Sequence, residues 1–101
     1  MKKKFKRSGV FCVYMLECQD GTYYTGYTNS LEKRIKQHND TNSGAKYTRD
    51  RRPVKVVWSK EYNYFKPAFL AEKRIKTLTR KQKESLVNGK RLDKVLMEAG
   101  K

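Results

Sequence analysis

Apolar residues near the start of the chain fall in two short runs, at residues 10–18 and 22–27, with Gln19-Asp20-Gly21 between them. Both runs are rich in aromatic and β-branched residues, which predicts the two strands of a hairpin. A third run of this kind, VKVVWSKEY, begins at Val54 and predicts another strand. The sequence therefore predicts three strands, the first two of which are adjacent along the chain.

Apolar residues recur at helical spacing in other parts of the chain. A cap pattern at residues 29–32 opens a short amphipathic helix that runs to about His38. Pro67 suits the first turn of a second helix, and a capping-box pattern at residues 79–82 opens a third, which ends at Asn88-Gly89. The apolar positions of these helices and of a last amphipathic segment are Leu31, Ile35, Ala68, Ala71, Ile75, Leu78, Leu92, Val95, Leu96 and Ala99.

The order of the elements, β-β-α-β-α-α, predicts an α+β fold in which helices flank a small three-stranded antiparallel sheet. A chain of 101 residues has the length of one domain. We expect this domain at residues 10–90, after a basic leader at residues 1–9 and before an amphipathic tail at residues 91–101. Residues 39–53 are polar and basic, and we expect them to form a loop.

The length of the hairpin turn decides which tyrosines are neighbours. A two-residue turn at Asp20-Gly21 would place Tyr14 and Tyr24 on opposite faces of the hairpin. A three-residue loop that includes Gln19 has glycine at the left-handed position and opposes Tyr14 to Gly26, so the two tyrosines share a face. We prefer this register because the other face then carries a packing set of Phe11, Val13, Met15, Tyr23 and Tyr27.

The charge of the chain narrows the class of partner. There are 25 Lys and Arg against 10 Asp and Glu, which gives a net charge of +15. A small domain this basic favours nucleic acid, because each neutralised phosphate releases counterions. No segment approaches the ~18 apolar residues of a membrane span, and the basic start does not resemble a signal peptide. Cys12 and Cys18 lie about 20 Å apart along one predicted strand, too far for a disulfide. We therefore expect buried thiols and a cytoplasmic protein.

The tyrosine face of the hairpin is the first candidate site. Gly26 interrupts a strand opposite Tyr14, and such a glycine often marks a close approach of the backbone. The alternative is an aromatic hairpin whose tyrosines only pack. Arg34 and His38 are one helical turn apart on the next predicted helix. A guanidinium there suits a phosphate and an imidazole suits proton transfer, although a solvated basic helix explains the same pattern.

Two further candidates lie later in the chain. Glu72 falls on the apolar stripe of its predicted helix, where an inward carboxylate needs a cation or a metal; the alternative is a surface pair with Lys76. The second candidate is the basic loop, because basic residues interleaved with an aromatic ring suit a nucleic-acid strand, whereas the alternative is a solvated loop. Its candidate residues are Lys46, Tyr47, Arg49, Arg51 and Arg52.

The order and spacing of these residues resemble the GIY-YIG nuclease family. Cys12-Val13-Tyr14 stands where the family has Gly-Ile-Tyr, and Tyr24-Thr25-Gly26 stands where it has Tyr-Ile-Gly. The stretches YTGYTNSLEKRIKQHN and GAKYTRDRRPVKVVWSKEY are similar to the small single-domain bacterial members, which in turn resemble the nuclease domain of structure-specific endonuclease subunits. The resemblance runs from about Phe11 to Val87. Cys12 and Thr25 depart from the motifs. Some members place an asparagine after the helix that carries the glutamate, whereas here only Asn88, beyond Glu84, is available.

The resemblance implies roles for five residues. Tyr14 and Tyr24 would flank the scissile phosphate, and Arg34 would stabilise its developing charge. His38 would assist proton transfer or place the water, and Glu72 would hold a divalent metal, Mg²⁺ or Mn²⁺. Which of Tyr14, Tyr24 and His38 is the general base stays open.

The expected function is metal-dependent endonuclease hydrolysis of DNA phosphodiester bonds, linked to DNA repair or recombination. We expect recognition of branched or single-stranded structure, since no second domain is present to read base edges. Gly26 and the basic loop would contact the nucleic acid. A non-catalytic nucleic-acid-binding module of the same fold is the alternative function, and RNA is an alternative substrate. The sequence does not identify a protein partner.

Overall fold

The computed structural model describes residues 11–40 and 46–100, so the predicted basic leader lies outside the described residues. Three strands form one antiparallel sheet in the order β2-β1-β3, which confirms the predicted α+β class. The strands are β1 (Phe11–Glu17), β2 (Tyr23–Thr28) and β3 (Lys55–Tyr62). The helices of the described residues are α1 (Leu31–Asp40), α2 (Lys46–Arg49), α3 (Phe65–Lys76), α4 (Arg80–Val87) and α5 (Leu92–Ala99).

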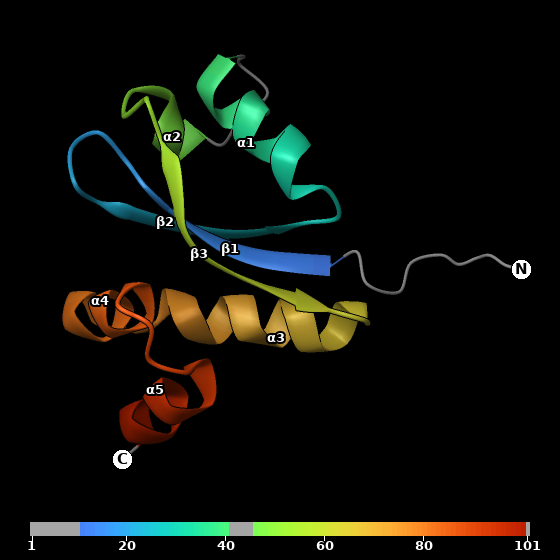
Figure 1. Ribbon diagram of the computed structural model, residues 1–101, viewed down its shortest axis with the longest axis vertical. Helices are drawn as coiled ribbons and strands as arrows, with labels where there is room; N and C mark the ends of the chain where they lie inside the picture. The colour runs from blue at the N-terminus through green and yellow to red at the C-terminus, as the bar shows by residue number, and fades with distance from the viewer. Residues whose placement is uncertain (1–10, 41–45, 101) are drawn as a thin grey trace, which may run out of the picture.

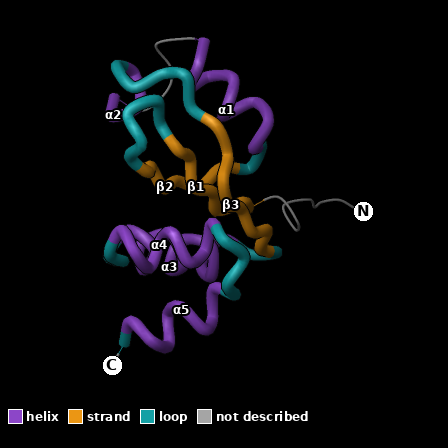
Figure 2. The backbone as a smooth tube through the Cα atoms, turned by 60° about the vertical axis from the view of Figure 1, so that its left-hand side comes forward, coloured by secondary structure: helices purple, strands orange, loops and turns teal. Residues whose placement is uncertain are grey.

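Helices cover both faces of the sheet (Figure 1). The short helices α1 and α2 lie on one side, and α3, α4 and α5 lie on the other, an arrangement that Figure 2 shows from a second direction. In the described ranges, no helix is both long and apolar enough to cross a membrane. The sheet therefore separates two layers, each of which has its own packed cluster.

The two clusters follow the alternation of side chains along the central strand β1. Val13 and Met15 belong to the larger cluster, whose other buried members come from or adjoin α3, α4 and α5: Ala68, Ala71, Ile75, Leu78, Leu86 and Val95. Tyr14 and Leu16 point the other way and pack with Cys18, Val54, Leu31 and Ile35. Cys12 and Cys18 are buried free thiols, as expected. Val95 of α5 thus packs in the main core, while the predicted boundary at residue 90 stays a prediction.

The hairpin has the three-residue turn that the sequence favoured. Tyr14 pairs with Gly26 and Leu16 pairs with Tyr24. Gly21 has a φ of 85°, a left-handed conformation that glycine adopts at little cost, and the Cys18 amide donates to the Thr22 carbonyl at 2.8 Å. The predicted register is therefore confirmed.

The polar segment between α1 and β3 differs from the expected loop, because it contains the one-turn helix α2. Four residues carry too little apolar periodicity to be found in a sequence. A helix this short is marginal by itself and depends on tertiary contacts. The later helices follow the prediction more closely: Thr79 and Gln82 form the capping box of α4, and Gly89 beyond its end has a φ of 103°.

Candidate active site

Tyr14 is the centre of the candidate site. Its side chain is 1% exposed, and its ring lies over the backbone of Gly26 on the neighbouring strand. A Cβ atom at residue 26 would lie 2.7 Å from Tyr14 Oη and 2.9 Å from Cζ, both closer than atoms can approach. The space at Gly26 is therefore occupied by the tyrosine ring, and a contact of Gly26 with nucleic acid stays a prediction.

His38 joins Tyr14 to α2 through a chain of hydrogen bonds. Nε2 of His38 lies 3.0 Å from Tyr14 Oη, and Nδ1 lies 2.8 Å from Thr48 Oγ1. The side chains of His38 and Thr48 are fully buried. Tyr24 closes the group, with its ring centroid 5.3 Å from that of His38 and 6.5 Å from that of Tyr14. Thr48 could not be found from the sequence, because a lone hydroxyl in a polar segment carries no signal of its partner.

Hydrogen bonds from side chains to backbone atoms hold together the segments that surround the His38 imidazole. The Asn39 side chain donates to the Val54 carbonyl at 3.1 Å and accepts from the Val54 amide at 2.8 Å, which ties the end of α1 to the residue before β3. The Arg52 guanidinium donates to the carbonyls of Asn39 and Arg49, each at 3.1 Å. These bonds satisfy carbonyls near the ends of α1 and α2. Arg52 therefore fastens together the segments that carry His38 and Thr48.

Burial favours the neutral forms of both Tyr14 and His38. Loss of water around the ring raises the pKa of Tyr14 to about 12, although a hydrogen bond from Arg34 opposes the shift. Burial lowers the pKa of His38 to about 4, and the positive charge of Arg34 adds to this effect. A neutral imidazole donates through one nitrogen and accepts through the other. His38 can therefore accept a hydrogen bond from the Tyr14 hydroxyl through Nε2 while it donates one to Thr48 Oγ1 through Nδ1.

Arg34 and Glu72 approach Tyr14 from different helices. Arg34 on α1 donates to Gln37 Oε1 at 2.9 Å and borders a surface depression of about 480 Å³ between α1 and the ends of β1 and β2. Glu72 on α3 is 13% exposed on its side chain and lies 3.4 Å from the Lys76 ammonium. Its negative charge contributes to the raised pKa of Tyr14. Tyr14, Tyr24 and His38 thus form one contacting group, and the charges of Arg34 and Glu72 act on the Tyr14 hydroxyl.

The predicted nucleic-acid contacts in the basic segment have different surroundings. Arg51 is paired with Asp20 in the hairpin turn, with Nε 3.1 Å from Oδ2, and Arg49 is exposed. The side chains of Lys46 and Tyr47 lie outside the described residues. Nucleic-acid contact by these residues and by Arg52 therefore stays a prediction.

Thr25, the middle residue of the second motif, points away from the tyrosine face toward the main core. It pairs with Met15 across the hairpin and is buried, and its hydroxyl has no hydrogen-bond partner. An unsatisfied buried hydroxyl costs about 1–3 kcal/mol. The substitution therefore affects stability on the face opposite the candidate catalytic groups.

The site combines two tyrosines on one face of a sheet, an arginine and a histidine on the next helix, and a glutamate on a later helix. This combination defines a known class of domain. Residues 10–85 match the sequence model of the GIY-YIG catalytic domain, and the chain belongs to this family, which is in general a nuclease family. It is 46% identical over 81 residues to UPF0213 protein YazA of Bacillus subtilis, a match that covers 80% of this chain and 81% of YazA.

Two solution NMR structures have the same fold. Protein EF2693 from E. faecalis matches with a TM-score of 0.56 and 44% identity, over 82% of this chain and 85% of that one. UPF0213 protein BH0048 from Bacillus halodurans matches with a TM-score of 0.51 and 44% identity, over 77% and 82% of the two chains. The chain is thus similar to small single-domain members, and its family implies a nucleic-acid substrate.

Nucleases of this family generally use divalent metals, and Glu72 is a carboxylate whose charge acts on Tyr14. Among residues 11–40 and 46–100, no three His, Cys, Asp or Glu side chains gather closely enough to hold a metal ion. A single carboxylate does not suit Zn²⁺, which takes three or four protein ligands. It does fit Mg²⁺, which keeps several waters and is usually bound by one or two carboxylates together with substrate phosphates.

Proposed function

We propose that this protein is a metal-dependent endonuclease that hydrolyses DNA phosphodiester bonds. The observation that carries the proposal is the convergence on the Tyr14 hydroxyl. It contacts His38 at 3.0 Å, and its pKa responds to the charges of Arg34 and Glu72. A guanidinium, a carboxylate and a neutral proton acceptor around one hydroxyl are the groups that phosphodiester hydrolysis requires.

The pKa values disfavour both a preformed tyrosinate and a free imidazolium. With a pKa of about 12, ionising Tyr14 at pH 7 costs about 7 kcal/mol, at 1.36 kcal/mol for each pH unit. His38 has a pKa of about 4, so it is unprotonated at pH 7 and is a weak base, and protonating it costs about 4 kcal/mol. We therefore assign the base to the pair in one concerted step: as a water proton reaches Tyr14 Oη, the tyrosine proton moves to His38 Nε2, and the Nδ1–H bond to Thr48 Oγ1 holds the imidazole in place.

Arg34 and Glu72 act on the phosphate rather than on the water. The Arg34 guanidinium lies beside Tyr14 at the edge of the surface depression, where it can bind the developing negative charge through two parallel hydrogen bonds. Glu72 would hold Mg²⁺ or Mn²⁺, which when bound supplies positive charge to the phosphate and the leaving oxygen. Before the metal binds, the Lys76 ammonium supplies the countercharge at 3.4 Å.

The substrate class follows from the surface. A net charge of +15 favours a polyanion, and the family implies nucleic acid. We propose DNA recognised by branched or single-stranded structure, in DNA repair or recombination, with RNA as the alternative substrate.

The ion pair of Glu72 with Lys76 favours a second candidate, a non-catalytic nucleic-acid-binding module in which Glu72 only balances charge. Cleavage of branched, single-stranded and duplex DNA, and of matched RNA, in Mg²⁺ or Mn²⁺ separates the two functions. Glu72→Gln is expected to abolish cleavage and leave affinity nearly unchanged. Glu84→Gln is the matched control, because it breaks an exposed i,i+4 pair with Arg80 on α4. No cleavage by the parent protein, or full activity in Glu72→Gln, would refute the enzyme proposal.

A further inference from the structure

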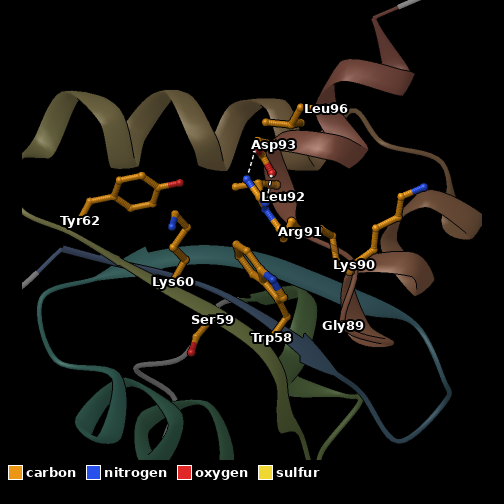
Figure 3. Close-up of a pocket in the computed structure, with 11 residues that line it drawn as sticks. Trp58, Ser59, Lys60, Tyr62, Gly89, Lys90, Arg91, Leu92, Asp93 and Leu96 are labelled. Atoms are coloured by element: carbon orange, nitrogen blue, oxygen red, sulfur yellow. Dashed lines mark hydrogen bonds and ion pairs between the residues drawn. The ribbon is translucent and has the colours of Figure 1, made fainter.

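A groove on the opposite side of the sheet from Tyr14 is lined by a different set of aromatic and charged side chains. It lies between the edge strand β3 and the start of α5 and has a volume of about 620 Å³, within the range of about 300–1,000 Å³ for ligand sites. Figure 3 shows Trp58, Lys60 and Tyr62 projecting from β3 into the groove, while Ser59 points the other way. The side chains that alternate along an edge strand thus line one surface.

The groove combines an apolar floor with a rim that carries three cations and the carboxylate of Asp93. Trp58 and Tyr62 are half-buried and pack against the main core together with Leu92 and Leu96. The Lys60 ammonium lies 5.6 Å from the centre of the Tyr62 ring. Lys90 and Arg91 supply the other positive charges.

Lys90 and Arg91 each form an ion pair with an acidic side chain, and both pairs are weak enough for a ligand to replace them. Lys90 pairs with Glu98, and Arg91 pairs with Asp93, each at 2.7 Å. Exposed pairs of this kind contribute only about 0–1 kcal/mol, so a phosphate can compete for the cations. The groove is therefore suited to a ligand that has both negative charge and flat apolar faces.

The groove also lies partly outside the catalytic domain that the family shares. The matching model ends at residue 85, whereas the wall that faces β3 is made by residues 89–96. The tyrosine face is on the other side of the sheet, against α1. Binding in the groove consequently does not require the catalytic groups.

We propose that this groove is a second nucleic-acid site, which binds unpaired nucleotides of a single strand. Flat apolar faces joined by phosphates match aromatic rings beside cations, and stacking on an aromatic ring tolerates any base. In a duplex the base faces are covered by neighbouring bases, so they cannot lie against Trp58. A strand bound here is held away from the catalytic face, and the site works whether or not the protein cleaves.

Trp58 reports on the groove directly, because it is the sole tryptophan in the chain. The test titrates the whole protein in a chelator with a dT oligonucleotide of about 12 nucleotides, within the span of known single-strand sites. Tryptophan emission and oligonucleotide anisotropy are recorded together. We expect saturable quenching by dT, and the matched rU strand shows whether RNA occupies the same site. A duplex of equal length is expected to bind without quenching.

Two lysine variants test the groove without disturbing the core, because both side chains are exposed. Lys60→Ala is expected to weaken dT binding a few-fold and to reduce the slope of log K against log salt by about 0.7, the value for one phosphate of a single strand. Lys55→Ala, on the same strand but outside the groove and paired with Glu17, is expected to leave the quenching unchanged.

Binding seen by anisotropy without quenching, or dT binding by the Lys60→Ala variant that equals that of the parent, overturns the proposal. Quenching by an apolar peptide but not by dT also overturns it and identifies a protein-docking groove. Because the chelator prevents cleavage, failure here is distinct from failure of the nuclease assay.

Discussion

Replacing Gly26 by alanine tests whether the Tyr14 ring lies over this position. The added methyl carbon would stand 2.7 Å from Tyr14 Oη and 2.9 Å from Cζ. The ring cannot easily move away, because it is buried and its hydroxyl is bonded to His38 at 3.0 Å. The substitution must therefore displace the ring, shift strand β2 or break the bond to His38.

The expected loss of stability follows from one stabilising and two destabilising effects. Alanine in place of glycine in a strand gains about 0.5–1 kcal/mol of backbone entropy. Overpacking a filled site costs about 1–3 kcal/mol, and leaving a buried His38 nitrogen without its partner costs about 1–3 kcal/mol. We expect Gly26→Ala to lower the free energy of unfolding by about 1–5 kcal/mol. Tyr14→Phe removes the closest atom, so the same substitution in that background is expected to cost about 1 kcal/mol less.

Urea unfolding of the four proteins in this cycle, followed by circular dichroism, gives each free energy, provided that the denaturant slope is constant. Gly100→Ala is the control, because a Cβ there meets only ordinary contacts at 3.6 Å and beyond, and it is expected to change stability by less than about 0.5 kcal/mol. A Gly26→Ala protein as stable as its parent, or additive costs in the cycle, would refute the placement of the ring.

Four further measurements test other parts of the structure. The pKa of His38 is about 4 in the folded protein against an ordinary 6.5, so as the pH falls the unfolded chain binds a proton at this residue first. The free energy of unfolding should therefore be constant above pH 6.5 with respect to His38 and should fall by about 3 kcal/mol between pH 6.5 and pH 4. A flat pH profile in urea unfolding would contradict the burial of His38. Thr25→Val removes a buried hydroxyl without a partner and should raise the free energy of unfolding by about 1 kcal/mol; a loss of stability would mean that the hydroxyl is bonded. Thr79→Ala removes the cap of α4 and should cost about 1 kcal/mol in the same assay. Arg51→Ala should reduce the salt slope of DNA binding by about one if the guanidinium contacts a phosphate, and an unchanged slope excludes it from the binding surface.

Short-range geometry explains why the hairpin and the α4 cap could be predicted. A glycine at the left-handed position selects a three-residue turn, and the turn then sets every pair along both strands. Tyr14 opposite Gly26 follows from that choice. The capping box of Thr79 and Gln82 likewise involves residues only three apart, so its pattern is visible in the sequence.

The segment from α1 to β3 could not be predicted in the same way. Thr48 faces His38, ten residues away, and Arg52 reaches the Asn39 carbonyl, thirteen residues away. The one-turn helix α2 is too short to carry a periodic pattern. The basic residues of this segment indicated nucleic acid, whereas the structure gives Arg52 bonds to the protein backbone.

Side-chain periodicity and turns of a few residues were enough to predict the order of the elements other than α2, the register of the hairpin and the residues on its tyrosine face. The packing of the folded chain places His38, fully buried, between Tyr14 and Thr48, and sets Trp58 opposite residues of α5 across a groove. No local pattern specifies this packing, because burial and pKa depend on segments that lie far apart in the chain.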